Sequence, residues 1–129
     1  MPPRHAQPPA RLVIDARPRA AGGAALLAEI EVRGRALLAQ QVELASRLRP
    51  TQIEIHARPE DHARLGGLIE HSAGVGSTAV VFRTGTPPLH LPILRVDRIY
   101  GPARLERAVR RGRDPETAVI WRLDTPHGI

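Results

Sequence analysis

The sequence predicts an α/β domain with a mostly parallel sheet of about five strands and helices on both faces. Segments rich in β-branched residues alternate along the chain with segments whose apolar residues recur at helical spacing. That alternation is typical of parallel strands joined by crossover helices. Of the 129 residues, 42% are hydrophobic and only 2% are aromatic, so aliphatic side chains have to build the core of a single domain.

The first fifty residues supply one strand and one helix. Residues 11–16 (RLVIDA) predict the first strand, and the Pro and Gly residues of 17–25 predict a turn. Residues 26–32 fit either a helix or an extended segment. In residues 35–48, Leu and Val recur at helical spacing, which predicts a helix that ends before Pro50.

The middle of the chain repeats this order. Residues 51–57 (TQIEIHA) alternate between apolar and polar side chains, which predicts the second strand. Pro59 and the two acidic residues after it predict a helix that runs to about His71, because Pro and acidic side chains suit a first helical turn. After a loop at 74–77, residues 78–84 (TAVVFRT) predict the third strand.

The last third completes the sheet. Residues 85–92 carry three prolines and predict an irregular connection to a fourth strand at 93–100 (ILRVDRIY). Pro102 and Gly112 bound a third helix at 102–111, and residues 117–123 (TAVIWRL) predict the fifth strand. This order of strands and helices is that of a three-layer, Rossmann-like fold.

The domain is expected to occupy residues 11–129. Residues 1–10 are rich in proline and lack an apolar stretch, so they predict a disordered leader and not a signal peptide. The absence of cysteine excludes disulfides and thiolate metal sites. Since no apolar run approaches the roughly 18 residues of a membrane span, the expected location is the cytoplasm.

The net charge is +6, and all 19 basic residues are arginine, because the chain contains no lysine. The densest run comprises Arg107, Arg110, Arg111 and Arg113. We interpret it as the solvated end of a helix, where cations are favourable, with phosphate or nucleic-acid contact as the alternative. The scarcity of aromatic side chains removes the stacking platforms of RNA-binding surfaces, so nucleic acid is not the expected partner.

Carboxylates at strand ends are the candidate metal ligands. Asp15, Asp97 and Asp124 fall at or near the ends of predicted strands, where ligands of open α/β sheets bind. Carboxylates that converge there can hold Mg²⁺ together with substrate phosphates, and Asp97 is the ligand we favour. The alternative is that each aspartate serves only a turn or a cap.

The segment after the first strand is the candidate phosphate loop. Glycine lets backbone N–H groups approach an anion, so the predicted nucleotide-binding residues are Asp15, Arg17, Arg19, Gly22 and Gly23. The segment matches neither G-x-G-x-x-G nor the P-loop, and a plain turn is the alternative. No residue receives a catalytic role, because no serine has a nucleophile-elbow context and the histidines lack metal-ligand spacing.

The chain resembles sugar-phosphate and cytidylyl-type nucleotidyltransferases, the MobA-like NTP transferases, in residues 32–45 followed by 52–57 and 59–62 (PEDH). Residues 34–38 (GRALL) resemble the G-R-P-L-L segment that opens a helix after that family's signature loop. Residues 94–100 (LRVDRIY) resemble the strand whose aspartate binds the catalytic metal ion, here Asp97. The resemblance covers roughly residues 11–124 and implies nucleotide binding with Mg²⁺.

The chain also departs from that family. The family's loop resembles A-A-G-x-G-x-R followed by Pro-Lys, whereas residues 15–27 read DARPRAAGGAALL and no lysine exists. Arginine does not replace that lysine, which stabilises charge on the transferring phosphate. We expect the chain to lack the family's acceptor-binding half, which would follow Asp124. In some relatives such a domain is fused ahead of a CDP-alcohol phosphotransferase, so the resemblance allows a fused or partner C-terminal domain. The alternative is a homo-oligomer formed through an uncovered edge strand.

Three functions follow, in this order of preference. The first is a degenerate nucleotidyltransferase-like domain without catalysis that binds nucleotide weakly or has a structural or regulatory role. The second is an active Mg²⁺-dependent nucleotidyltransferase acting on a sugar or polyol phosphate. The third is an arginine-rich α/β interaction domain that binds nucleic acid or protein.

Overall fold

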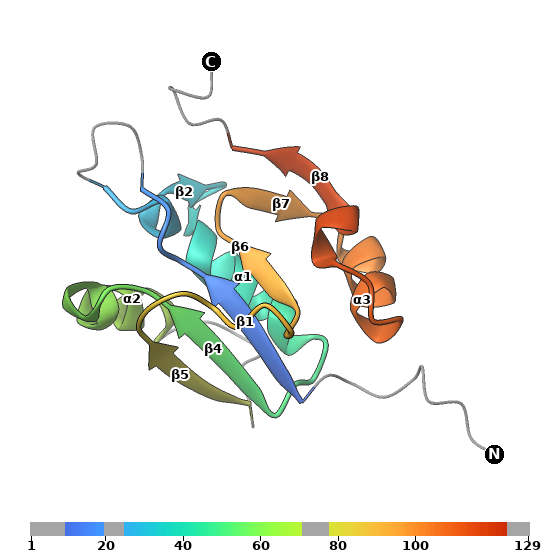
Figure 1. Ribbon diagram of the computed structural model, residues 1–129. Coiled ribbons are helices and arrows are strands. Elements are labelled where there is room, and N and C mark those ends of the chain that lie inside the picture. The colour runs from blue at the N-terminus through green and yellow to red at the C-terminus, as the bar shows by residue number, and fades with distance from the viewer. Residues whose placement is uncertain (1–9, 20–24, 71–77, 124–129) are drawn as a thin grey trace.

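The computed structural model describes residues 10–19, 25–70 and 78–123, and shows a mixed α/β fold (Figure 1). Its main sheet contains four strands, all parallel. In spatial order these are β5 (Ala79–Arg83), β4 (Gln52–His56), β1 (Arg11–Asp15) and β6 (Ile93–Arg95). The predicted α/β class and the parallel sheet are confirmed.

Two helices pack on one face of this sheet. Helix α1 (Leu37–Ser46) lies between β1 and β4 in the chain; the short 3₁₀ helix η3 (Pro59–Asp61) and α2 (His62–Ile69) lie between β4 and β5. The two helices contact each other, and Figure 1 shows α1 behind the sheet. Phe82 of β5 faces α2, with its ring centroid 5.3 Å from that of His62. The side chains of the strands that share this face are fully buried or nearly so: Leu12, Ile14, Ile53, Ile55 and Leu94.

The opposite face of the sheet carries buried polar groups. Glu54 is 1% exposed, and its carboxylate accepts hydrogen bonds from Arg11 and, at 2.9 Å, from Gln52. The bond from Arg11 holds the pKa of Glu54 below its usual value. His56 is also buried, with Nδ1 3.2 Å from the carbonyl oxygen of Gly85. The connection from β5 to β6 therefore covers this face, and Figure 1 shows it passing in front of β4 and β1.

The last third of the chain corrects the predicted sheet. The strand expected at 93–100 is two strands, because the chain turns at Val96 and Asp97, and β7 (Arg98–Tyr100) leaves the main sheet. Strand β8 (Val119–Arg122) pairs with β7 in a separate antiparallel sheet. The prediction of about five strands in one sheet was therefore wrong, since the fifth strand pairs elsewhere.

Backbone hydrogen bonds explain this departure. The N–H of Leu123 donates to the carbonyl of Asp97 at 2.9 Å, and the N–H of Gly101 donates to the carbonyl of Ala118 at 2.9 Å. Helix α3 (Pro102–Arg110) and the 3₁₀ helix η4 (Pro115–Ala118) connect β7 to β8. Strand β7 thus finds its partner in the end of the chain, not at the edge of the main sheet.

Residues 26–32, which fitted either a helix or an extended segment, form a short 3₁₀ helix and the first strand of a hairpin. The 3₁₀ helix η2 (Leu27–Glu29) leads into a hairpin of β2 (Glu31–Val32) and β3 (Arg35–Ala36). Its two central residues have positive φ angles, 57° at Arg33 and 79° at Gly34, as a type I′ turn requires. The hairpin takes the first two residues of the helix predicted at 35–48. The helices predicted at 59–71 and 102–111 are confirmed within the described residues.

Other predictions concern residues outside the described ones. The predicted leader (except Ala10), the predicted loop at 74–77 and the end of the chain from Asp124 fall there. Within the described ranges, none of the helices combines the length and the apolar character needed to cross a membrane.

The apolar face of β4 is expected to dominate stability. Replacing fully buried Ile55 with Ala leaves a cavity among β1, β5 and the helices, so it should lower the free energy of unfolding by about 2–5 kcal/mol. Ile120, 55% exposed on β8, is the matched control, and Ile120→Ala should cost about 0.5 kcal/mol or less. Urea unfolding measures both, and equal losses would contradict this packing.

Candidate functional site

The strand order identifies one edge of the sheet as the place to look for a ligand. From β1 the chain moves to β4 and β5 on one side, and then returns to β6 on the other side. Ligands of open α/β sheets bind beyond the carboxyl ends of the strands at such a reversal. Here these ends carry Asp15 on β1 and Arg95 on β6, which are partners in the register of the two strands. We call this place the β1/β6 switch point.

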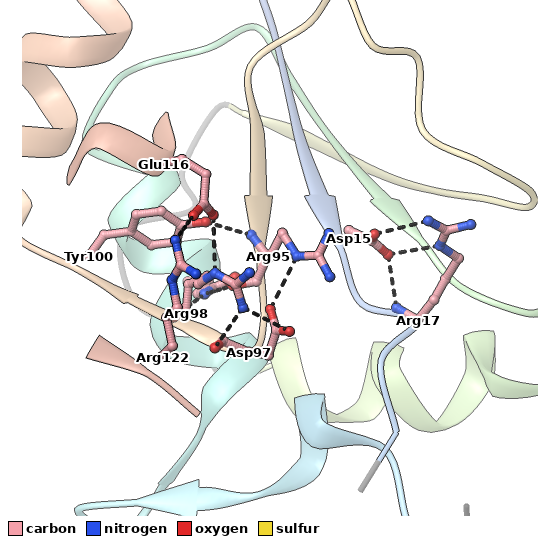
Figure 2. A network of polar contacts seen from close by, with 9 residues as sticks. Asp15, Arg17, Arg95, Asp97, Arg98, Tyr100, Glu116 and Arg122 are labelled. Carbon is pink, nitrogen blue, oxygen red and sulfur yellow. Dashed lines mark hydrogen bonds and ion pairs between the residues drawn. The ribbon is translucent and has the colours of Figure 1, made fainter. Parts of the chain in front are cut away.

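Asp15 and Arg17 form a two-point ion pair at the switch point (Figure 2). Arg17 Nε lies 2.9 Å from Asp15 Oδ1, Arg17 Nη2 lies 3.0 Å from Oδ2, and the Arg17 N–H also donates to Oδ1 at 3.1 Å. Burial alone raises the pKa of Asp15, which is 4% exposed. The hydrogen bonds from Arg17 and the charges of Arg17 and Arg95 outweigh burial, and the pKa of Asp15 lies below its ordinary value.

Asp97 is held by two arginines. Arg95 Nε lies 3.3 Å from Asp97 Oδ1, and Arg98 Nη1 lies 3.0 Å from Oδ2. Figure 2 shows the Arg95 side chain between Asp97 and Asp15. A lone carboxylate with a guanidinium on each oxygen does not fit Mg²⁺, which would have to displace both cations. Among residues 10–19, 25–70 and 78–123, no group of three or more His, Cys, Asp or Glu could hold a metal ion. The surroundings of Asp97 therefore do not support the predicted Mg²⁺ site.

The network extends from Asp97 to the β7–β8 pair. Glu116 of η4 accepts from Arg98 Nε at 3.1 Å and from Arg122 Nη2 at 3.0 Å. The hydroxyl of Tyr100 accepts the backbone N–H of Arg95 at 2.8 Å, and burial raises the pKa of Tyr100 to about 12, so the phenol is neutral. The four guanidinium groups exceed the three carboxylates they pair with by one positive charge: Arg17, Arg95, Arg98 and Arg122 against Asp15, Asp97 and Glu116.

Arg19, another of the predicted nucleotide-binding residues, pairs away from the switch point. Arg19 Nη2 lies 3.1 Å from Asp61 Oδ2, so this arginine connects the segment after β1 to the start of α2. Gly22 and Gly23 lie outside the described residues. The structure therefore brings together Asp15, Arg17 and, through Arg95, Asp97.

Sequence reasoning missed Arg95, Arg98, Glu116 and Arg122. Arg95 had one available signal, since it lies two residues before Asp97 and so points to the same side of an extended strand. The other three lie together only because β7 pairs with β8, and no local pattern reports that pairing.

The ion pair of Asp15 makes a prediction for acid stability. Because its pKa is lower in the folded chain, ionised Asp15 stabilises the fold above its ordinary pKa of 3.8, and this contribution is lost as the pH falls through the lowered pKa. Asp15→Asn should therefore be less stable than the wild type near neutral pH, and the difference should shrink below about pH 3.8. Glu54 is present in both the wild type and Asp15→Asn, so its titration contributes equally to both and does not change the difference between them.

Denaturant unfolding at several pH values measures this difference. Arg17→Gln should remove much of the same pH dependence, because it removes the main hydrogen-bond donor to Asp15. A difference between the wild type and Asp15→Asn that stays constant from neutral pH to acid would show that the ion pair does not stabilise the fold.

Comparison with known proteins adds no relative. The chain matches no protein-family model, no curated protein and no solved structure. Any function has to be inferred from the side chains of this chain itself, and the polar network at the β1/β6 switch point is the richest arrangement of such groups that the described residues contain.

Proposed function

We propose that this chain is a nucleotide-binding domain of the nucleotidyltransferase type that has no transferase activity. In this proposal the phosphates of a nucleotide bind at the β1/β6 switch point, where Arg17 and Arg95 contact them. The observation that carries it is the register pairing of Asp15 with Arg95 at the point where the strand order reverses.

The order of the strands supports a nucleotide as the ligand. Numbered along the chain, the four parallel strands lie in the order 3-2-1-4, with which the classic dinucleotide-binding sheet begins. Ligands of such sheets bind at the crevice between the first and fourth strands. We therefore interpret the fold as Rossmann-like, although its main sheet stops at four strands.

The charges at the switch point support phosphate as the group that binds there. Arg17 and Arg95 are 39% and 43% exposed, so part of each guanidinium faces solvent while carboxylates hold the rest. Each planar guanidinium offers five N–H donors, of which the ion pairs use only some. A phosphate meets cations that are already held in place, and binding costs little side-chain entropy.

The same residues argue against catalysis. The usual phosphate contact in such folds is a helix that begins directly after the first strand, but here α1 begins at Leu37, after a hairpin. Positive charge comes from side chains instead, and the carboxylates that would hold Mg²⁺ are occupied by arginines. With no lysine in the chain, the compact cation that stabilises charge on a transferring phosphate is also missing.

Nucleotide binding is best measured by thermal denaturation and calorimetry with ATP, CTP, GTP and UTP, each with and without Mg²⁺. A nucleotide at a hundred times its Kd should add about 2.7 kcal/mol to the stability. Arg17→Gln and Arg95→Gln should each weaken binding by about tenfold, because each removes a charge-assisted hydrogen bond. The Arg95→Lys variant should bind with intermediate affinity, since lysine keeps the positive charge but lacks the paired N–H donors of a guanidinium.

Arg110→Gln is the matched control. It removes the same charge from α3, where Arg110 pairs with Glu106 at 3.3 Å, and should leave the affinity unchanged. Binding that is insensitive to Arg17 and Arg95 would place the nucleotide elsewhere. Pyrophosphate release in the presence of Mg²⁺ and a sugar phosphate, lost in Asp97→Ala, would replace this proposal with an active transferase.

A further inference from the structure

Helix α3 carries a stripe of arginines on one side. Arg104, Arg107 and Arg111 are spaced by three and four residues, which places them on one face of the helix. Figure 1 shows α3 beyond β6, on the side of the molecule away from β5. Leu105 and Val109, on another side of the helix, are buried in the core, so the stripe faces outward and its position is fixed by packing.

These arginines lack acidic partners, unlike the arginines at the switch point. Among the described residues, no carboxylate lies within ion-pair distance of Arg104, Arg107, Arg111 or Arg113, whereas Arg110 of the same helix pairs with Glu106. Like charges three and four residues apart destabilise a helix. The stripe is therefore a cost to the fold unless an anion neutralises it.

The helix dipole explains only part of the stripe. Cations are favourable in the last turn of a helix, which accounts for Arg107 and Arg111. Arg104 lies in the first turn, directly after Pro102 and Ala103, where the positive end of the dipole disfavours a cation. Arg104 was not part of the run interpreted as a solvated helix end, and the dipole does not account for it.

The end of α3 adds a fourth arginine to the stripe. The N–H of Arg113 donates to the carbonyl of Ala108 at 2.8 Å and that of Gly112 to Val109 at 3.1 Å, which is a Schellman cap. Gly112 has a φ of 69°, as this cap requires. The chain thus turns back along the helix and brings Arg113 beside the stripe, where the four arginines, Ala108 and Thr117 surround one hollow of about 220 Å³.

We propose that this arginine hollow is a binding site for a compact oligophosphate, a diphosphate or a triphosphate group. No carboxylate lines it, and its four positive charges exceed what one orthophosphate carries. From Arg104 to Arg111 the stripe extends about 10 Å along the helix, which suits a chain of two or three phosphates. Planar guanidinium forks are the side chains that best match phosphate oxygens. The site is separate from the β1/β6 switch point and does not rest on the proposed function.

The test is calorimetry of the full chain with inorganic tripolyphosphate, and with orthophosphate and a single-stranded DNA 20-mer as comparisons. Wild-type protein should bind tripolyphosphate more tightly than either. Arg107→Gln/Arg111→Gln should weaken binding by more than about tenfold, because two charge-assisted contacts are lost. Arg104→Gln alone should weaken it less. All three positions are exposed and the substitutions relieve like-charge repulsion, so the thermal midpoint without ligand should not fall below that of the wild type.

Two control chains separate this site from the switch point. Arg110→Gln removes a paired arginine from the same helix and should bind tripolyphosphate as the wild type does. Arg17→Gln/Arg95→Gln removes the switch-point cations, so the tripolyphosphate that this variant still binds should be lost when Arg107→Gln/Arg111→Gln is added. The proposal is wrong if the wild type does not bind, or if Arg110→Gln weakens binding as much as the double variant. Tighter binding of the DNA, with a salt dependence that the double variant reduces, would show a nucleic-acid surface instead.

Discussion

The pairing of β1 with β6 is the contact on which the rest of this structure depends. Strand β1 pairs with β4 on one side and with β6 on the other, so its three aliphatic residues, Leu12, Val13 and Ile14, are completely buried. The same register brings Asp15 beside Arg95, and the turn that follows β6 brings Asp97 to the other side of Arg95. Core and polar network are therefore two consequences of one strand pairing.

The described arginines occur in two different surroundings. At the strand ends, guanidinium groups are held by carboxylates and lie in a fixed arrangement with a small excess of positive charge. On α3, arginines lie around a hollow that no carboxylate lines. The net charge of +6 does not distinguish these cases, because only the positions of the acidic partners decide which guanidinium groups are available to an anion.

Local patterns predicted the elements well and their partners less well. The strand at 51–57 and the helices at 59–71 and 102–111 were found because alternation, proline and helical spacing are local signals. The residues RVDR continued the pattern of β6, yet the chain turns there, because β8 supplies a partner from the other end of the domain. The same reason explains the site: Asp15, Arg17 and Asp97 follow from strand ends, whereas Glu116 and Arg122 required the β7–β8 pairing.

We propose that nucleotide phosphates bind at the β1/β6 switch point. This proposal is tested most directly by an NMR titration of ¹⁵N-labelled protein with the nucleotide that binds best, observing both backbone amides and arginine Nε–H groups. If they do, the largest shifts should fall on residues 15–18 and 95–98, with the Nε–H signals of Arg17 and Arg95 among them. Shifts confined to other parts of the molecule, with these signals unchanged at saturation, would contradict it.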